Sequence, residues 1–256
     1  MRIALHTWFM VGRQLRNLAR EPIWIVMMLI QPMIWLLLYG QLFSRVPSLR
    51  GQASSYVEFL APGVVVMNAF FGATWSGMAT IDDLEKSVVD RFLATPASRV
   101  SIVLSQVVRA GLTAVVQALI ILGVGYALGV RVHGGIGGWL AVLGAAFLLS
   151  TAFGGISQGI ALLVRKEATM IAVANFIGLP LMFLSSILIT QSTMPEWMQT
   201  VSDWNPVNWA AEAARDAIVA GGNWDGVLAH LGALVGVTVV TAAFATWTLR
   251  QYERSI

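Results

Sequence analysis

The longest charged run of the chain, Asp82 to Arg99, lies between two strongly apolar segments. Asp82 followed three residues later by Glu85 is a variant of the capping box, which predicts that a helix begins there. Pro96 would end this helix, because proline lacks an amide hydrogen and restricts the residue before it. The apolar residues between these points recur at helical spacing: Leu84, Val88, Val89, Phe92 and Leu93. A short helix with one apolar and one charged face is suited to docking against another protein.

Residue groups that would support catalysis, metal binding or nucleotide binding are missing from the sequence. The chain has no cysteine, and its histidines, His6, His133 and His230, are too scattered to form a metal site. Neither Lys86 nor Lys166 follows a glycine, so the phosphate-binding loop of ATPases is absent. We therefore predict no catalytic residue, no metal and no cofactor bound by this chain.

The composition predicts a membrane protein. Of the 256 residues, 57% are hydrophobic and only 11% are charged, and the mean hydropathy is +0.74. A soluble domain of this length could not bury so much apolar surface. The net charge of +3 comes from basic residues dispersed among short loops, which argues against nucleic-acid binding.

The distribution of apolar residues predicts a single all-α polytopic membrane domain, residues 1–256. Residues 2–20 read as a basic amphipathic helix lying at the membrane interface. A cleaved signal peptide is the alternative for the first apolar run, with Gly51-Gln52-Ala53 as the small-residue site, but the run is too long. The six predicted spans are 23–43, 60–81, 104–129, 138–163, 169–191 and 228–249. Arg109 lies near the start of the third span, from which its side chain can reach back to the surface.

The basic residues predict the orientation of these spans. If both termini are cytoplasmic, twelve of the sixteen Lys and Arg residues fall on the cytoplasmic side, as the positive-inside rule requires. The docking segment 82–99 is then cytoplasmic. The excess of Arg over Lys is typical of a GC-rich bacterial genome, so we expect a bacterial cytoplasmic membrane.

The external segment 192–227 is rich in tryptophan, which favours the headgroup region of a bilayer. Asn205-Pro206 interrupts it, and Asn208 is placed to cap a second short helix that continues through Val219. We therefore predict two short re-entrant helices between spans 5 and 6.

Several of these stretches together resemble type-2 ABC transporter permeases. The run from Glu85 to Arg99 resembles the loop after the second span of that family, typically acidic-Arg-Leu-Leu, then Thr-Pro and Ser-Arg. The remaining matches are LPLMFLSS at 179–186, MPEWMQ at 194–199, and Asn205-Pro206 with Glu212 and Arg215. The match covers nearly the whole chain, and within the family it is most similar to daunorubicin-resistance-type drug-export permeases. Ser87-Val88 and Ser186 depart from the usual Gly-Thr and Gly.

The resemblance implies a half-transporter. Two such chains (a homodimer, or a pair with a homologous permease) would work with two ABC ATPase subunits, which use ATP and Mg. They would export a hydrophobic or amphiphilic small molecule across the lipid bilayer. The residues expected to dock the ATPase are Asp82, Asp83, Glu85, Lys86, Asp90, Arg91, Phe92, Leu93, Thr95, Pro96 and Arg99.

The resemblance also implies that spans 2 and 5 face the partner chain and line the transport path. The candidate path residues are Asn68, Phe71, Trp75, Asn175, Phe176, Met182 and Phe183. Asn68 and Asn175 are the leading candidates, since an amide in hydrocarbon needs a hydrogen-bonding partner. Ordinary helix packing is the alternative explanation for each of these residues. Export of a polysaccharide or polymer precursor, or a membrane assembly role without transport, are the alternative functions.

Overall fold

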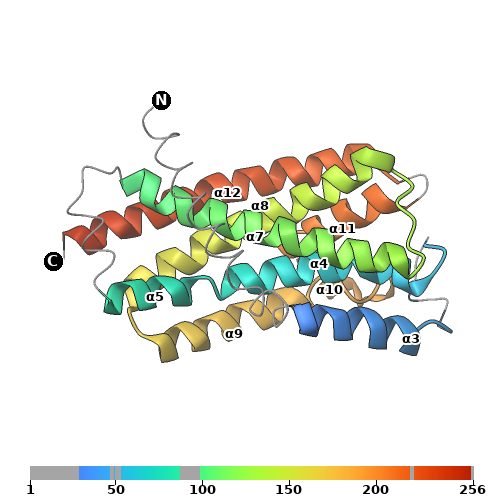
Figure 1. Ribbon diagram of the computed structural model, residues 1–256, viewed down its shortest axis with the longest axis horizontal. Helices are drawn as coiled ribbons and strands as arrows, with labels where there is room; N and C mark the ends of the chain where they lie inside the picture. The colour runs from blue at the N-terminus through green and yellow to red at the C-terminus, as the bar shows by residue number, and fades with distance from the viewer. Residues whose placement is uncertain (1–28, 47–48, 50–52, 87–98, 220–221, 255–256) are drawn as a thin grey trace.

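The structure is a computed structural model that describes residues 29–46, 49, 53–86, 99–219 and 222–254, with only the backbone for 99–102. Its helices run side by side along one long axis (Figure 1). Four helical segments are long and apolar enough to cross a membrane: Tyr56–Glu85, Val103–Ala127, Gly135–Val164 and Trp224–Glu253. The all-helical prediction therefore holds for the described residues, and four of the six predicted spans are helices long and apolar enough to cross a membrane.

The other two predicted spans are shorter helices. The described part of the first is the apolar helix Leu29–Leu42, which contains the π-helix η1 (Trp35–Tyr39) and ends in α3 (Gly40–Leu42). The fifth is α9 (Glu167–Phe183), so its predicted end at residue 191 is wrong. Hydrogen bonds from the side chain of Asn205 to the carbonyls of Leu181 and Leu184 end α9 early. The predicted interfacial helix 2–20 lies outside the described residues.

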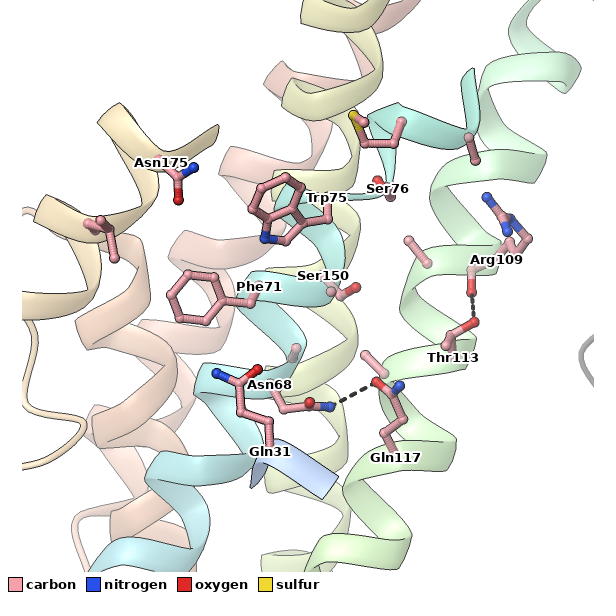
Figure 2. A pocket seen from close by; sticks show the side chains of 17 residues that line it. Gln31, Asn68, Phe71, Trp75, Ser76, Arg109, Thr113, Gln117, Ser150 and Asn175 are labelled. Carbon is pink, nitrogen blue, oxygen red and sulfur yellow. Dashed lines mark hydrogen bonds between the residues drawn. The ribbon is translucent and has the colours of Figure 1, made fainter. Parts of the chain in front are cut away.

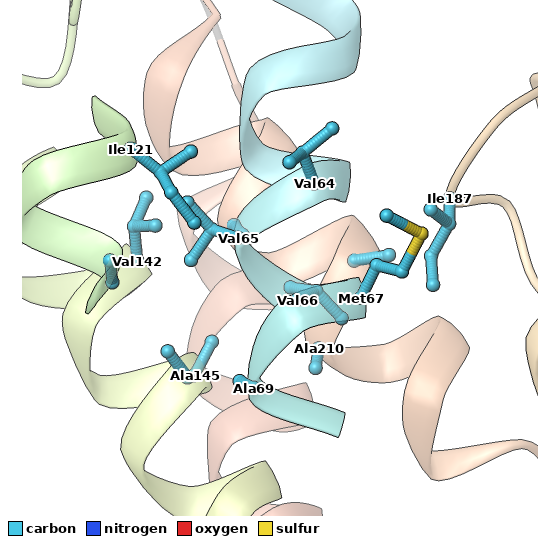
Figure 3. Packing of buried hydrophobic residues seen from close by; sticks show 14 of the residues in the cluster. Val64, Val65, Val66, Met67, Ala69, Ile121, Val142, Ala145, Ile187 and Ala210 are labelled. Atoms are coloured by element: carbon cyan, nitrogen blue, oxygen red, sulfur yellow. The ribbon is translucent and has the colours of Figure 1, made fainter. Parts of the chain in front are cut away.

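Helix α8 (Gly135–Val164) occupies the centre of the bundle. It packs against α12 (Trp224–Glu253), α7 (Arg99–Ala127) and α4 (Tyr56–Thr74). Small residues allow this close packing: a Cβ built on Gly155 would lie 3.1 Å from Thr241 of α12. The core between α4, α7 and α8 includes the aliphatic residues Val65, Ile121 and Val142 (Figure 3).

The second span is interrupted near its middle. Helix α4 ends at Thr74, and α5 (Gly77–Glu85) begins after the two turn residues Trp75 and Ser76. The hydroxyl of Ser157 on α8 stabilises the interruption. It donates a hydrogen bond to the Thr74 carbonyl (2.6 Å) and accepts one from the Gly77 amide (2.8 Å). Non-helical backbone within an apolar bundle requires such partners, since no water is there to replace them.

Because α5 begins at Gly77, the predicted helix start at Asp82 is wrong. Asp82 lies within α5, and Lys86 follows the last helical residue, Glu85. The amide of Gly77 already has a buried partner in Ser157, so this helix begins without a capping box.

Two short helices, α10 (Glu196–Ser202) and α11 (Pro206–Ile218), precede α12. Two helices were predicted here, but the predicted cap of the second, Asn208, is wrong. Asn205 caps α11, accepting from the Val207 amide at 3.0 Å, with Pro206 in the first helical position, where its missing amide hydrogen costs nothing. Helix α11 packs against α8, α12 and α4, through a face rich in small residues such as Ala210 and Ala214.

The Asn205 side chain also ends α9. Its amide nitrogen donates to the carbonyls of Leu181 (2.7 Å) and Leu184 (2.8 Å), carbonyls that a longer helix would use itself. Asn208 then accepts from the Ser186 amide at 2.8 Å. The chain after α9 is thus held by side chains of α11 and of the residue before it.

Candidate functional site

A cavity of about 690 Å³ runs along α4 between α7 and α9 (Figure 2). Phe71, Trp75 and Ser76 come from α4 and its interruption, Arg109, Thr113 and Gln117 from α7, Ser150 from α8 and Asn175 from α9. Gln31 of the first helix lies near Asn68 in the lining. The broken second span positions the site, because Trp75 and Ser76 are the two turn residues between its halves.

Two amide side chains of the cavity lining form a hydrogen bond with each other. The Asn68 side chain donates from Nδ2 to Oε1 of Gln117 at 2.8 Å, and Gln117 is buried. This bond joins α4 to α7 in apolar surroundings, where an unpaired amide would be costly. Asn175 uses its Nδ2 for the Ile171 carbonyl of its own helix at 3.0 Å.

The aromatic wall of the cavity consists of Phe71 on α4 and Trp75, which follows the last residue of that helix (Figure 2). Their rings stand on the side of α4 that looks toward α9, and Trp75 is 36% exposed. An aromatic wall beside a few fixed polar groups is typical of sites for organic small molecules.

The cavity contains four of the seven candidate path residues: Asn68, Phe71, Trp75 and Asn175. Met182 is buried in the apolar core. Phe176 and Phe183 are 83% and 61% exposed on α9, outside the cavity. A role of these three in a transport path stays a prediction.

Six polar lining residues were not among the path candidates: Gln31, Ser76, Arg109, Thr113, Gln117 and Ser150. Gln117 carries the same signal in the sequence as Asn68 and Asn175, an amide within an apolar span. That signal pointed to α7 as well as to spans 2 and 5. The path candidates came only from spans 2 and 5, because the family resemblance favoured those spans.

Arg109 is the cationic group of the described cavity lining. It lies about 15 Å along α7 from the start of that helix, at 1.5 Å per residue. Its Nε is buried and has no hydrogen-bond partner. Its guanidinium points toward the end of the cavity at which α5 lies (Figure 2), and its predicted reach to the membrane surface stays a prediction.

The predicted docking residues are described only in part. Asp90, Arg91, Phe92, Leu93, Thr95 and Pro96 lie outside the described residues, as does the side chain of Arg99. Lys86 donates to Asp82 at 2.7 Å, and both side chains are more than half exposed. This hydrogen bond raises the pKa of the Lys86 ammonium. Asp83 accepts a weaker bond from Gln106 at 3.4 Å.

The docking residues in α5 share one end of the bundle with the α8–α9 turn and the end of α12 (Figure 1). That end carries Lys86, Arg165, Lys166 and Arg250. The turn between α7 and α8 lies at the opposite end.

Residues 6–219 match the model of the family described as ABC-2 type transporter. The chain belongs to the ABC-2 type transporter family. Permeases of this family are embedded in a membrane and work with a separate ABC ATPase subunit, so the family predicted from the charged run and the three later motifs is confirmed.

Curated relatives share the family at modest identity. A putative transport permease, ycf38, of Cyanophora paradoxa is 31% identical over 80% of this chain and 71% of its own length. The daunorubicin resistance ABC transporter permease protein DrrB1 of Streptomyces coeruleorubidus is 29% identical over 97% of this chain and 84% of its own. A probable doxorubicin resistance permease, DrrC, of Mycobacterium tuberculosis is 21% identical over 92% and 85%.

Proposed function

We propose that this ABC-2 permease exports a hydrophobic or amphiphilic small molecule from the cytoplasm or the inner leaflet, driven by ATP hydrolysis in the partner subunit. The observation that carries the proposal is the cavity along α4, which combines the aromatic side chains of Phe71 and Trp75 with amide side chains from several helices. Its volume of about 690 Å³ falls in the range of about 300–1,000 Å³ common for small-molecule sites. The drug-resistance relatives support the same class of cargo.

In this proposal the end of the bundle that carries α5 faces the cytoplasm, and two copies of the chain pair with two ATPase subunits. The basic residues Lys86, Arg165, Lys166 and Arg250 gather at that end, which supports the orientation. The membrane is then the bacterial cytoplasmic membrane, and α5 with the segment that follows it meets the ATPase.

The function is tested by ATP hydrolysis in proteoliposomes that contain both subunits. The first compound to titrate is 1-pyrenebutanol, an uncharged aromatic amphiphile, and daunorubicin, an aromatic amine taken from the name of a relative, is the second. Stimulation of hydrolysis and ATP-dependent movement of the compound across the bilayer would support the proposal. An ATPase whose rate and compound distribution do not depend on the permease would contradict it.

Phe71→Ala is expected to raise the compound concentration for half-maximal stimulation about tenfold, because an aromatic contact to the cargo is lost. Tyr126→Ala is the control, since Tyr126 is an exposed aromatic residue near the end of α7 that is neither a path candidate nor part of the cavity lining. If the two variants behave alike, the cavity on α4 is not the site that selects the cargo.

Charge reversal in α5 tests the docking surface. Asp82→Lys and Lys86→Glu are each expected to weaken binding of the ATPase by about tenfold, since charged pairs at an interface then repel. The double exchange of Asp82 and Lys86 restores the local ion pair but not the charge at each position. We therefore expect it to remain weak, as measured by co-purification and by titration of labelled ATPase.

Asp225→Lys is the control for these reversals, because Asp225 is exposed in the first turn of α12, at the other end of the bundle. Asp90→Lys and Arg91→Glu extend the test to the following segment. Unchanged ATPase affinity in all the α5 and segment variants would remove the docking assignment. Recovery in the double exchange would assign Asp82 and Lys86 a structural role only.

A further inference from the structure

The charge of the cavity lining comes from Arg109. Among the described residues that line the cavity it is the one charged side chain, and no carboxylate shares the lining with it. The remaining polar groups there are amides and hydroxyls. A ligand with a negative group would therefore meet one cation and no opposing acid in the cavity wall.

The guanidinium also has unused hydrogen-bonding capacity. Its Nε is buried without a partner, and within the described residues no ion pair joins it to an acid. Asp83, which interacts with Arg109 electrostatically, has its carboxylate near Gln106 instead. A buried, unpaired donor is costly, and a planar guanidinium is suited to a carboxylate or phosphate.

The aromatic residues of the cavity lie on a different element from Arg109. Phe71 lies on α4 and Trp75 directly after it, whereas Arg109 lies on α7 (Figure 2). A flat apolar body against α4 would leave an attached anionic group free to approach α7. The hydrogen bond between Asn68 and Gln117 joins α4 to α7 elsewhere in the cavity lining.

We propose that the cavity selects amphiphiles that carry one anionic group, a carboxylate or a phosphate, and that Arg109 binds that group. This inference deepens the proposed export function and rests on it. Arg109 is then the residue that determines charge specificity, while Phe71 and Trp75 hold the apolar part of the same molecule.

Three matched probes test the charge preference on the purified full chain in phosphatidylcholine nanodiscs. They are 1-pyrenebutyrate, 1-pyrenebutanol and 1-pyrenebutylamine, which differ in the end group alone. Binding is measured by energy transfer from tryptophan to pyrene, since the chain contains ten tryptophans. We expect the anion to bind about tenfold more tightly than the alcohol, because a charge-assisted hydrogen bond is gained, and the amine to bind most weakly.

Arg109→Gln is expected to remove the preference while the alcohol still binds, which shows that the cavity is intact. Arg109→Lys should retain part of it, and Arg250→Gln, which changes an exposed arginine on α12, should retain all of it. Equal affinities of the wild type for the three probes, or an unchanged preference in Arg109→Gln, would overturn the inference.

The anionic group could belong to a free molecule or to a lipid headgroup, and nanodiscs containing phosphatidylglycerol separate the two. Competition by this lipid would assign the headgroup, and an unchanged affinity for pyrenebutyrate would assign a free anionic amphiphile. Either result supports an anion at Arg109. Because these measurements need no ATPase, failure of the charge preference is distinguishable from failure of permease-dependent ATP hydrolysis, which would contradict the export function itself.

Discussion

Replacing Gly77 with leucine is expected to destabilise the bundle by roughly 3–5 kcal/mol, through overpacking and a lost buried hydrogen bond. A Cβ at this position would lie 2.5 Å from the Ser157 carbonyl oxygen and 2.7 Å from Ser157 Oγ. Both distances are too short, so α5 and α8 must separate. Separation breaks the bonds by which Ser157 joins Thr74 and Gly77. The measurement is unfolding of the purified chain in mixed micelles, followed by circular dichroism.

Gly123→Leu is the matched control, because Gly123 is exposed on α7 and a Cβ there meets nothing within 4 Å. It should change the free energy of unfolding by less than about 1 kcal/mol. Ser157→Ala removes the hydroxyl without adding bulk and should cost about 1–3 kcal/mol. Equal stability of the two leucine variants would show that the interruption of the second span does not depend on close contact at Gly77.

Asn205→Ala is expected to destabilise the chain by about 3 kcal/mol, because one side chain serves two helices. It caps α11 through the Val207 amide and satisfies the carbonyls of Leu181 and Leu184 at the end of α9. Only 3% of Asn205 is exposed, so water cannot replace these bonds. The same micelle unfolding experiment measures the loss.

Asn223→Ala supplies the comparison for Asn205. Asn223 caps α12 through the Gly226 amide at 3.1 Å, but it is exposed and should cost about 1 kcal/mol. Asn205→Asp separates the two roles, since a carboxylate can accept from Val207 but cannot donate to the two carbonyls. If this variant is as stable as the wild type, the link from Asn205 to the end of α9 contributes nothing.

The predicted helices follow from the apolar runs, and helix α8 shows why. Almost every residue of Gly135–Val164 is apolar or small, so a helix that satisfies its own backbone is the favourable state in lipid. The charged run after the second span stands out for the opposite reason, since charge is costly inside the bundle. Its later residues, such as Asp90 and Arg91, carry the family motif, and the family comparison confirmed the family.

The boundaries of α9 and α5 could not be found in this way, because residues distant in the sequence set them. Nothing near Phe183 requires the helix to end there; Asn205, twenty-two residues later, supplies the hydrogen bonds. The second span likewise has no proline near Thr74, and its interruption depends on Ser157 of α8. Side chains that replace backbone hydrogen bonds from another element leave no local pattern.

The sequence alone determined that this chain is an apolar helical membrane protein with a charged segment after its second span, because hydropathy and charge are properties of each residue, while the permease family came from the resemblance of its motifs. The tertiary structure decided which polar residues share a cavity. Asn68 and Gln117 meet, and Arg109 joins them, whereas Phe176 lies outside. The physical reason is rotation: an almost uniformly apolar helix has no hydrophobic face that fixes which side turns inward, so packing against its neighbours makes that choice.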